Sequence, residues 1–375
     1  MTVEIEPVHS SRQRRAFVEI PWSLYKQDPC WVPPLKFDRL AQIDPKHPFF
    51  EHAEWQGFIA RLAGRPVGRI SAQIDRLNAA QGRPDLGYFG MIEAPDDPAV
   101  FAALFAAAEA WLKSRGAKTS AGPMNLSINQ EVGLLVDGFD TPPYFMMGHA
   151  PRYYGARIEA LGYRKAVDTL AYLMDPEFKI PPAMAAIEKR LAGRMVVRKI
   201  DRKRKDEELK AICAVFNDAW ANNWGFVPFT EREFLAIGHE MLLLIDDDYI
   251  QIAEVDGEIA AFIVLLPNVN EVIADLNGRL LPFGWAKLLW RLKVRHPTSA
   301  RVPLMGVRQQ FQRTRLGPGL AFAIIHAGRN AYVARGVKRV EMSWILEGNQ
   351  GMRNIIETIG GRVSKRYRIY DKSLA

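Results

Sequence analysis

The sequence predicts an α/β protein built from two tandem domains that share one plan. The chain has 375 residues, more than a single hydrophobic core usually supports. A strand, glycine turn and second strand occur in residues 58–74 and again in residues 251–267, with Gly64 and Gly257 at matching places. Hydrophobic residues make up 48% and charged residues 25%, which is typical of a folded globular protein.

The other elements repeat in the same order at a shift of about 193 residues. Each hairpin is preceded by a short strand and a helix, predicted over 10–26 in the first half and 205–220 in the second. After the hairpin and a long strand, a helix ends on a glycine, Gly116 or Gly336. A strand, a second helix with a glycine turn and a last strand follow. We therefore predict domains over 1–175 and 195–375, joined by a proline-containing linker over 176–194.

Composition limits the cellular setting and the partners. Formal net charge is +8 and the pI is near 9.4, which favours an anionic partner. Cys30 and Cys213 lack metal-like spacing and are predicted to be packing residues in a reducing compartment. There is no signal-peptide pattern and no apolar run long enough for a membrane span, so we expect a cytoplasmic protein. No motif supports nucleic-acid binding or a metal site.

A basic, glycine-containing turn in the second half has the features of a phosphate-binding loop. An apolar strand over 302–307 leads into the turn 312–319, and a long apolar helix is predicted to start near Pro318. Glycines allow close backbone approach, and a helix N-terminus presents unpaired N–H groups to an anion. Arg313 and Arg315 add guanidinium groups that suit phosphate. An ordinary strand-to-helix turn with solvated arginines is the alternative.

With this loop in this order of elements, the sequence resembles the GNAT (acetyltransferase-like) superfamily. The resemblance implies two domains, each a mixed, mostly antiparallel sheet flanked by helices, and acyl-CoA as co-substrate without a metal. It implies that the loop holds the CoA pyrophosphate, that a splayed strand pairs with the pantetheine arm, and that an asparagine lies near the thiol. Thr314 and Pro318 depart from the family's loop pattern. The residues at the corresponding positions are Met305, Gly306, Val307, Arg308, Arg313, Thr314, Arg315, Leu316, Gly317, Gly319 and Asn349.

The first half lacks such a loop, because Asp96 and Asp97 precede its corresponding helix and would repel a pyrophosphate. They are predicted to be a helix N-cap and first-turn acids, and this copy is expected not to bind CoA. Segments such as DPCWVPPL and SWILEGNQGMR resemble a bacterial subgroup of double-GNAT proteins that is similar to the bacterial ceramide synthases. This resemblance implies transfer of an acyl group to a long-chain, sphingoid-base-like amine.

Acylation requires a neutral amine, and each pKa unit to be overcome costs about 1.36 kcal/mol, so a general base helps. Glu347, two residues before Asn349, is the first candidate, and His149 is the alternative. A tyrosine, Tyr153, Tyr154 or Tyr367, is a candidate proton donor for the leaving thiolate.

Two segments predict an apolar acceptor. The stretch WANNWGFVPF is rich in aromatic residues and predicts either one wall of an apolar pocket or interdomain packing. Residues 280–296 form a basic amphipathic pattern, typical either of a helix at a membrane interface or of a surface helix with one buried side. The first alternative implies peripheral contact with an anionic membrane surface. The candidate substrate residues are Trp220, Trp224, Phe226, Phe229 and Tyr153.

Two other functions fit the same sequence. One is an inactive acyl-CoA or lipid-binding module, favoured by Thr314 and Pro318 in the loop. The other is an N-acetyltransferase that acts on a small polar amine.

Overall fold

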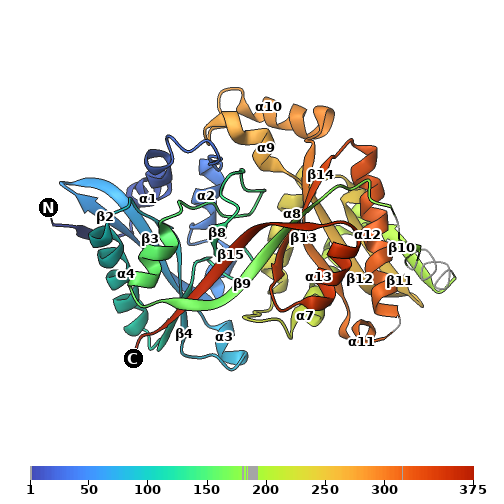
Figure 1. Cartoon of the computed structure of the whole chain (residues 1–375), viewed down its shortest axis with the longest axis horizontal. Helices are drawn as coiled ribbons and strands as arrows, with labels where there is room; N and C mark the ends of the chain where they lie inside the picture. Colours follow the sequence, from blue (N-terminus) through green and yellow to red (C-terminus); the bar gives the residue numbers. More distant parts are fainter. Residues whose placement is uncertain (1, 180, 183, 185–192, 315) are drawn as a thin grey trace. The chain divides into compact units, whose positions relative to one another are not determined.

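The chain folds into two compact units of mixed α/β structure, seen in a computed structural model that describes residues 2–179, 181–182, 184, 193–314 and 316–375 (Figure 1). The first unit is Met1–Thr169 with Ile273–Trp285 and Lys365–Ala375, and the second is Leu170–Val272 with Ala286–Ser364. This architecture confirms the predicted fold class.

The first unit has a sheet of neighbouring strands that is antiparallel except for its β4–β5 pair, which is parallel. The last strand of the chain, β15 (Arg362–Ser373), pairs antiparallel with β5 through Tyr370–Ser373 and also pairs with β8. The strands, in spatial order, are β1 (Glu4–Pro7), β2 (Ala53–Leu62), β3 (Arg65–Asp75), β4 (Leu86–Glu93) and β5 (Thr119–Gly122), while β6 (Met124–Asn125), β7 (Glu131–Val132) and β8 (Leu134–Asp137) follow β5 in sequence.

Two long helices cover this sheet. Helix α4 packs on β2 and β3 and buries Val100, Phe101, Leu104 and Phe105. Helix α1 packs on β3 and buries Phe17 and Val18; it starts with a capping box in which Ser10 and Gln13 satisfy each other's backbone N–H groups. The helices of this unit are α1 (Ser11–Leu24), α2 (Lys36–Gln42), α3 (Leu77–Ala80), α4 (Pro98–Lys113) and α5 (Tyr154–Ala160).

The second unit repeats this order. Its strands are neighbours in the sequence β10, β11, β12, β13, β14, antiparallel except for the parallel pair β13–β14. Helix α12 packs on β11, β12 and β13, as α4 packs on its own sheet. The elements are β10 (Met195–Lys199), α7 (Lys205–Trp220), α8 (Glu231–Leu244), β11 (Ile250–Val255), β12 (Glu258–Pro267), α9 (Val269–Ile273), α10 (Gly284–Trp290), β13 (Ser299–Val307), α11 (Gln309–Gln312), α12 (Leu316–Ala334), β14 (Arg339–Leu346) and α13 (Gln350–Thr358).

The two predicted hairpins are confirmed. Ala63 and Gly64 connect β2 to β3 with φ angles of 48° and 76°, and Asp256 and Gly257 connect β11 to β12 with φ angles of 52° and 87°. Two consecutive left-handed residues form the two-residue turn that matches the twist of an antiparallel pair, which explains the glycine at the second position of each.

The division between the units falls inside two strands, β9 (Arg164–Met174) and β15, and inside two helices, α9 and α10. The units therefore differ from the predicted continuous ranges, because residues 273–285 and 365–375 belong to the first unit. The ranges 1–175, 176–194 and 195–375 stay a prediction about the repeat, and much of 176–194 lies outside the described residues.

None of the helices in the described ranges combines the length and the hydropathy of a membrane-spanning segment.

Candidate functional site

Strands β13 and β14 separate near their carboxyl ends. They pair in parallel from Ser299 opposite Arg339 to Val302 opposite Met342, yet β13 continues to Val307 and β14 to Leu346. Beyond Val302, the described chain provides β13 with a strand partner only on its β12 side, where Met305 lies opposite Ile263. The backbone of residues 303–307 therefore has no strand partner on its β14 side among the described residues, and the predicted splayed strand, Met305–Arg308, overlaps this stretch.

Aromatic side chains lie at this splay. The Trp220 indole N–H donates to the carbonyl oxygen of Met305 at 3.0 Å, and the Trp220 ring meets the Trp344 ring edge-on with centroids 5.4 Å apart. Gly306 lies under α7, since a Cβ there would come within 2.8 Å of Phe262 and 3.2 Å of Ala219. The splay thus has a partly apolar wall formed by the end of α7 and by β14.

Glu347 and Asn349 lie in the turn that follows β14. Asn349 is the N-cap of α13, and its side-chain oxygen accepts from the Met352 N–H at 3.1 Å. Glu347 is half-buried, and its backbone carbonyl accepts from the Arg353 guanidinium at 2.9 Å. The Arg353 guanidinium also donates to the Tyr172 hydroxyl at 3.1 Å, so α13 holds this turn in place.

The predicted phosphate loop differs from expectation in two ways: it contains a short additional helix, and the helix that follows it begins earlier than predicted. Helix α11 follows β13 directly, and α12 begins at Leu316 rather than near Pro318, so the predicted start was wrong by two residues. Thr314 provides the reason: its hydroxyl accepts from the Leu316 N–H at 3.1 Å and its carbonyl from the Gly317 N–H at 3.3 Å. This local cap starts the helix early and leaves Pro318 inside the first turn, where a missing N–H is tolerated.

The loop's remaining predicted residues have different surroundings. Gly317 is required for packing, because a Cβ there would lie 2.6 Å from the Phe311 carbonyl oxygen. The Arg308 guanidinium donates to the Ile259 carbonyl at 2.7 Å, whereas Arg313 is exposed. Gly319 is buried in the first turn of α12. Arg315 lies outside the described residues.

In the first unit, the place that corresponds to the splay is filled by the chain itself. Strands β4 and β5 pair in parallel only from Leu86 to Tyr88, and β6 lies against β4 beyond that point. A Cβ on Gly90 would lie 1.8 Å from the Met124 carbonyl oxygen, and Asn125 accepts from the Met91 N–H at 2.7 Å. The backbone of Met124 and Asn125 therefore occupies the position that is open in the second unit.

The predicted N-cap of α4 is confirmed. Asp97 caps α4 by accepting from the Ala99 N–H at 2.8 Å. Asp96 precedes the helix and pairs with Arg157 at 2.7 Å, so it is not a first-turn acid as predicted.

The aromatic stretch 220–229 divides between core and surface. Phe226 and Phe229 are buried and pack around Phe216, with ring centroids 6.3 and 5.3 Å away. Trp224 is exposed and Trp220 is half-buried. Packing between α7 and α8 therefore accounts for the two phenylalanines, and the two tryptophans remain accessible.

A buried polar network in the first unit brings Tyr154 together with Glu93, a residue that sequence reasoning missed. One Glu93 carboxylate oxygen accepts from the Tyr25 hydroxyl at 2.7 Å and from the Tyr154 hydroxyl at 3.0 Å. Arg69 lies 3.7 Å from the other oxygen. Burial raises the pKa of Glu93, although Arg69 opposes the shift. The neighbouring Tyr153 hydroxyl donates to the Ala94 carbonyl at 2.8 Å.

His149 belongs to a buried histidine–aspartate pair in the same unit. Its Nε2 atom lies 2.7 Å from an Asp28 carboxylate oxygen, while Nδ1 is buried and has no hydrogen-bond partner among the described residues. Burial favours a raised Asp28 pKa, but hydrogen bonds from His149 and the Cys30 N–H outweigh it and leave the pKa lowered. The His149 ring also contacts Tyr25, with centroids 5.7 Å apart, which connects this pair to the Glu93 network. A carboxylate that orients a histidine is an arrangement able to move a proton.

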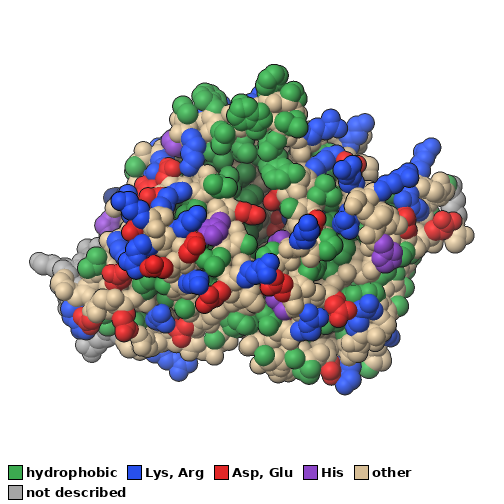
Figure 2. All heavy atoms as spheres, turned by 180° about the vertical axis from the view of Figure 1, so that it is seen from behind, with side chains coloured by type: hydrophobic (Ala, Val, Ile, Leu, Met, Phe, Trp, Pro, Cys, Tyr) green, Lys and Arg blue, Asp and Glu red, His purple; other side chains and the backbone are tan. Residues whose placement is uncertain are grey.

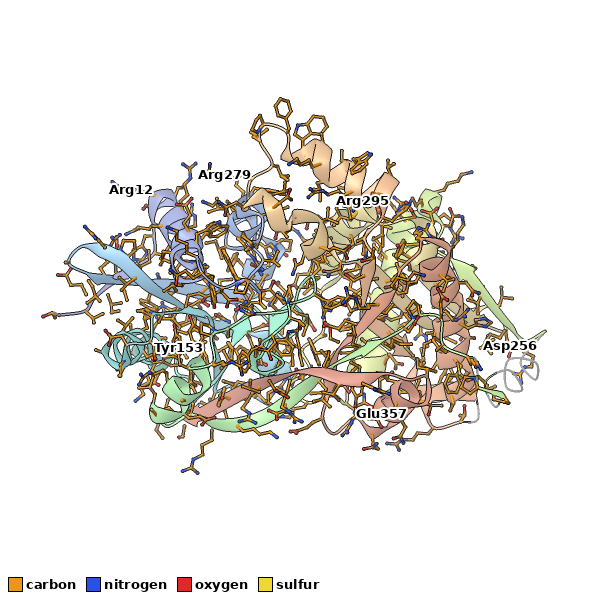
Figure 3. The ribbon with its side chains drawn as sticks, turned by 45° about the horizontal axis from the view of Figure 1, so that its top comes forward. Arg12, Tyr153, Asp256, Arg279, Arg295 and Glu357 are labelled. Carbon is orange, nitrogen blue, oxygen red and sulfur yellow. The ribbon has the colours of Figure 1, made fainter. Side chains whose placement is uncertain are left out.

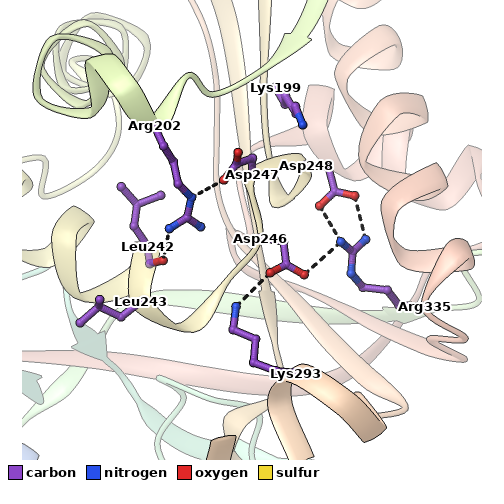
Figure 4. Close-up of a pocket in the computed structure, with 9 residues that line it drawn as sticks. All are labelled: Lys199, Arg202, Leu242, Leu243, Asp246, Asp247, Asp248, Lys293 and Arg335. Carbon is purple, nitrogen blue, oxygen red and sulfur yellow. Dashed lines mark hydrogen bonds and ion pairs between the residues drawn. The ribbon is translucent and has the colours of Figure 1, made fainter.

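A separate cavity of about 540 Å³ lies in the second unit among charged side chains (Figure 4). Arg335 donates to both Asp248 oxygens at 2.8 Å and to Asp246 at 3.1 Å, and Lys293 pairs with Asp246 at 2.9 Å. Arg202 pairs with Asp247. Because these charges largely neutralise one another, we interpret the cavity as a structural ion-pair network.

Solved structures with this fold align with nearly the whole chain. A tandem GNAT protein from the clavulanic acid biosynthesis pathway aligns with a TM-score of 0.57 at 12% identity, covering 100% of this chain and 99% of its own. A GCN5-related N-acetyltransferase from Sphaerobacter thermophilus gives a TM-score of 0.52 at 12% identity, covering 99% and 96%. A glucosamine N-acetyltransferase region of a fungal multi-domain β-N-acetylglucosaminidase gives 0.58 at 15% identity; there the match covers 99% of this chain but 38% of the other. No family model matches the sequence.

Two relatives are similar in sequence over most of their length. Protein YghO of Escherichia coli (strain K12) is 51% identical over 361 residues, which cover 96% of this chain and 93% of the relative. The bacterial ceramide synthase of Caulobacter vibrioides (strain NA1000 / CB15N) is 49% identical over 376 residues, covering 99% and 98%. Fold and relatives together define a GNAT-type, acyl-CoA-dependent N-acyltransferase. Within that class, the chain belongs to the family that contains YghO and the bacterial ceramide synthase.

Proposed function

We propose that this N-acyltransferase transfers a fatty acyl group from CoA to the primary amine of a long-chain, sphingoid-base-like lipid. The observation that carries the proposal is 49% identity, over 99% of the chain, to a protein named bacterial ceramide synthase. The amine nitrogen attacks the thioester carbonyl carbon, the carbon–sulfur bond breaks, and an amide and the CoA thiol form. The nitrogen loses a proton and the thiolate gains one, so the reaction balances without a further reactant.

The thioester belongs, in this proposal, to the splay between β13 and β14. Residues 303–307 of β13 have no strand partner on their β14 side among the described residues, and in this proposal an extended pantetheine arm pairs with this backbone next to the Trp220 indole that bonds to the Met305 carbonyl. The same place in the first unit holds the chain's own Met124 and Asn125. This difference supports one acyl-CoA per chain, bound in the second unit.

The pyrophosphate would lie at the start of α12, near Arg313. Thr314 already accepts from the Leu316 N–H and the Gly317 N–H, so a pyrophosphate has to displace these contacts or bind beside them. The exposed Arg313 guanidinium, and Arg315 beside it in sequence, supply the charge that makes displacement favourable. We expect Arg313→Ala with Arg315→Ala to weaken acyl-CoA binding by about tenfold or more, measured by calorimetry. Arg339→Ala, which removes an exposed arginine at the opposite end of β14, is the matched control.

For the proton of the amine, we propose Glu347 as the base and Asn349 as a residue that positions the thioester. Both lie in the turn after β14, at the carboxyl end of the splay. The His149–Asp28 pair is the second candidate, because one histidine nitrogen is held by a carboxylate and the other has no partner in the described chain. Glu347→Gln should lower kcat/KM by about a hundredfold. If Glu347→Gln retains the wild-type rate and His149→Gln loses it, the base is His149.

The acceptor chain would lie against Trp220, Trp224 and Trp344, three accessible aromatic residues of the second unit. Each methylene buried from water contributes about 0.8 kcal/mol, so two more methylenes should improve acceptor affinity roughly tenfold until the site is filled. Small polar amines lack this contribution.

The decisive experiment compares sphinganine, butylamine and amino acids as acceptors, each with acetyl-, octanoyl- and palmitoyl-CoA, and measures amide formation by mass spectrometry. We expect long-chain amines to react at least about a hundredfold faster in kcat/KM. Equal rates for short amines would refute the lipid acceptor and favour a small polar amine. Acyl-CoA binding without turnover on any amine would favour an inactive binding module.

A further inference from the structure

Hydrophobic side chains gather on a projecting segment, residues 279–295, which contains α10. Of the eleven large hydrophobic side chains that are exposed in the described part of the chain, six lie in this segment. Figure 2 shows them as a patch at the top of the view, where Figure 1 labels α10. Their exposed fractions are Leu281 80%, Phe283 73%, Val294 65%, Trp290 53%, Trp285 50% and Leu289 49%.

The segment is hydrogen-bonded to the rest of the chain at both ends, although its apolar side chains are exposed. Before it, the Trp22 indole donates to the Asn277 side chain at 2.8 Å and the Lys36 N–H to the Gly278 carbonyl at 3.0 Å. At its far end, Arg291 donates to the Val272 carbonyl at 2.6 Å, and Leu292 is buried. The exposed residues are therefore presented by an anchored element. The predicted apolar side of this helix is divided accordingly, with Leu292 facing the core and Trp285 and Leu289 facing out.

The charges within the segment have one sign, although one of them, Lys293, pairs with Asp246 from outside the segment at 2.9 Å. Residues 276–296 contain Arg279, Lys287, Arg291, Lys293 and Arg295 and no aspartate or glutamate. Arg279 and Arg295 are exposed and lie at the two ends of the segment (Figure 3). Apolar and tryptophan side chains flanked by arginine and lysine match the boundary between lipid headgroups and acyl chains.

We propose that the 279–295 segment docks this protein on an anionic phospholipid bilayer, with Leu281, Phe283 and Trp290 inserted and the basic residues against lipid phosphates. Charge complementarity selects this partner over a second copy of the chain. A two-fold dimer through the same patch would bring its exposed Arg279, Lys287 and Arg295 against the same three cations on the partner. The proposal concerns binding alone and does not rest on the identity of the acyl acceptor.

The test is co-sedimentation with vesicles of equal parts phosphatidylcholine and phosphatidylglycerol, compared with vesicles of phosphatidylcholine alone. The segment variant is Leu281→Ser, Phe283→Ser and Trp290→Ser. The matched control is Val196→Ser, Leu243→Ser and Val363→Ser, which replaces three exposed hydrophobic residues elsewhere in the chain. Circular dichroism checks that both variants stay folded, and all assays use the full-length chain.

We expect the wild type and the control variant to bind the anionic vesicles, more weakly as salt rises, and the segment variant to bind at least about tenfold more weakly. Arg279→Glu with Arg295→Glu should remove the preference for phosphatidylglycerol. Equal binding by the segment variant, equal loss in both serine variants, or no binding by the wild type would each overturn the proposal. A wild-type dimer that the segment variant converts to a monomer, measured by light scattering, would assign the patch to a second copy instead.

Discussion

Asn349 has a measurable structural role in addition to the catalytic one that we propose. Because its side chain caps α13, removing it should lower the free energy of unfolding by about 1 kcal/mol. We expect Asn349→Ala to show this loss in urea unfolding and Asn349→Asp to restore the cap, since a carboxylate is favourable at a helix N-terminus. If Asn349 also positions the thioester, turnover should stay low in Asn349→Asp. Full recovery of the turnover rate in Asn349→Asp would show that Asn349 acts only as the helix cap.

Glu93 should make stability depend on pH in a defined direction. Burial raises its folded-state pKa above the ordinary value of 4.5, so the folded protein binds this proton more tightly than the unfolded chain does. The stability that this proton contributes is present at low pH and is lost as pH rises through the folded-state pKa.

Glu93→Gln cannot ionise and should therefore gain stability relative to the wild type as pH rises above about 4.5. Urea unfolding of both proteins across this pH range measures the difference. The exposed Glu258→Gln is the control and should show no such trend. A difference that is constant with pH would mean that Glu93 is ionised throughout and is neutralised by Arg69.

At the scale of elements, β6 fills the space beside β4 in the first unit, whereas nothing equivalent pairs with β13 in the described part of the second unit. The close approach of β6 to β4 depends on Gly90. A Cβ there would lie 1.8 Å from the Met124 carbonyl oxygen, so Gly90→Ala must push β6 out of its place beside β4. We expect Gly90→Ala to lower the free energy of unfolding by about 3 kcal/mol or more. Gly348→Ala, where no atom lies within 4 Å of the added carbon, should change it by less than about 0.5 kcal/mol. Similar effects at the two sites would contradict the filled splay of the first unit.

For the whole molecule, the asymmetry between the units predicts the binding stoichiometry. The splay of the second unit is open beyond Val302, whereas Met124 and Asn125 occupy the corresponding place in the first. Titration calorimetry with palmitoyl-CoA should give one site per chain. Two equivalent sites would show that β6 can be displaced by the ligand.

The sequence by itself determined the local elements and their repetition. Turn chemistry placed both hairpins, because a left-handed pair ending in glycine is readable from Ala63-Gly64 and Asp256-Gly257. The N-cap at Asp97 was also predictable from the sequence, because the capping bond joins residues two positions apart. Family resemblance placed the splay at Met305–Arg308, which overlaps the stretch after Val302 where β13 no longer pairs with β14. Two local predictions were wrong. Helix α12 starts two residues earlier than the glycine pattern indicated, because Thr314 caps it there, and Asp96 precedes α4 instead of lying in its first turn.

The tertiary structure decided which side chains meet and which remain exposed. Glu93 meets Tyr25 and Tyr154, residues 68 and 61 positions away, and His149 meets Asp28 from 121 positions away. The periodicity of hydrophobic residues does not predict such long-range pairs, because they depend on the order of the strands and on burial. The 279–295 segment has the same amphipathic pattern whether its apolar side is buried or exposed. Only packing settled that question, by burying Leu292 and leaving Trp285 and Leu289 in water.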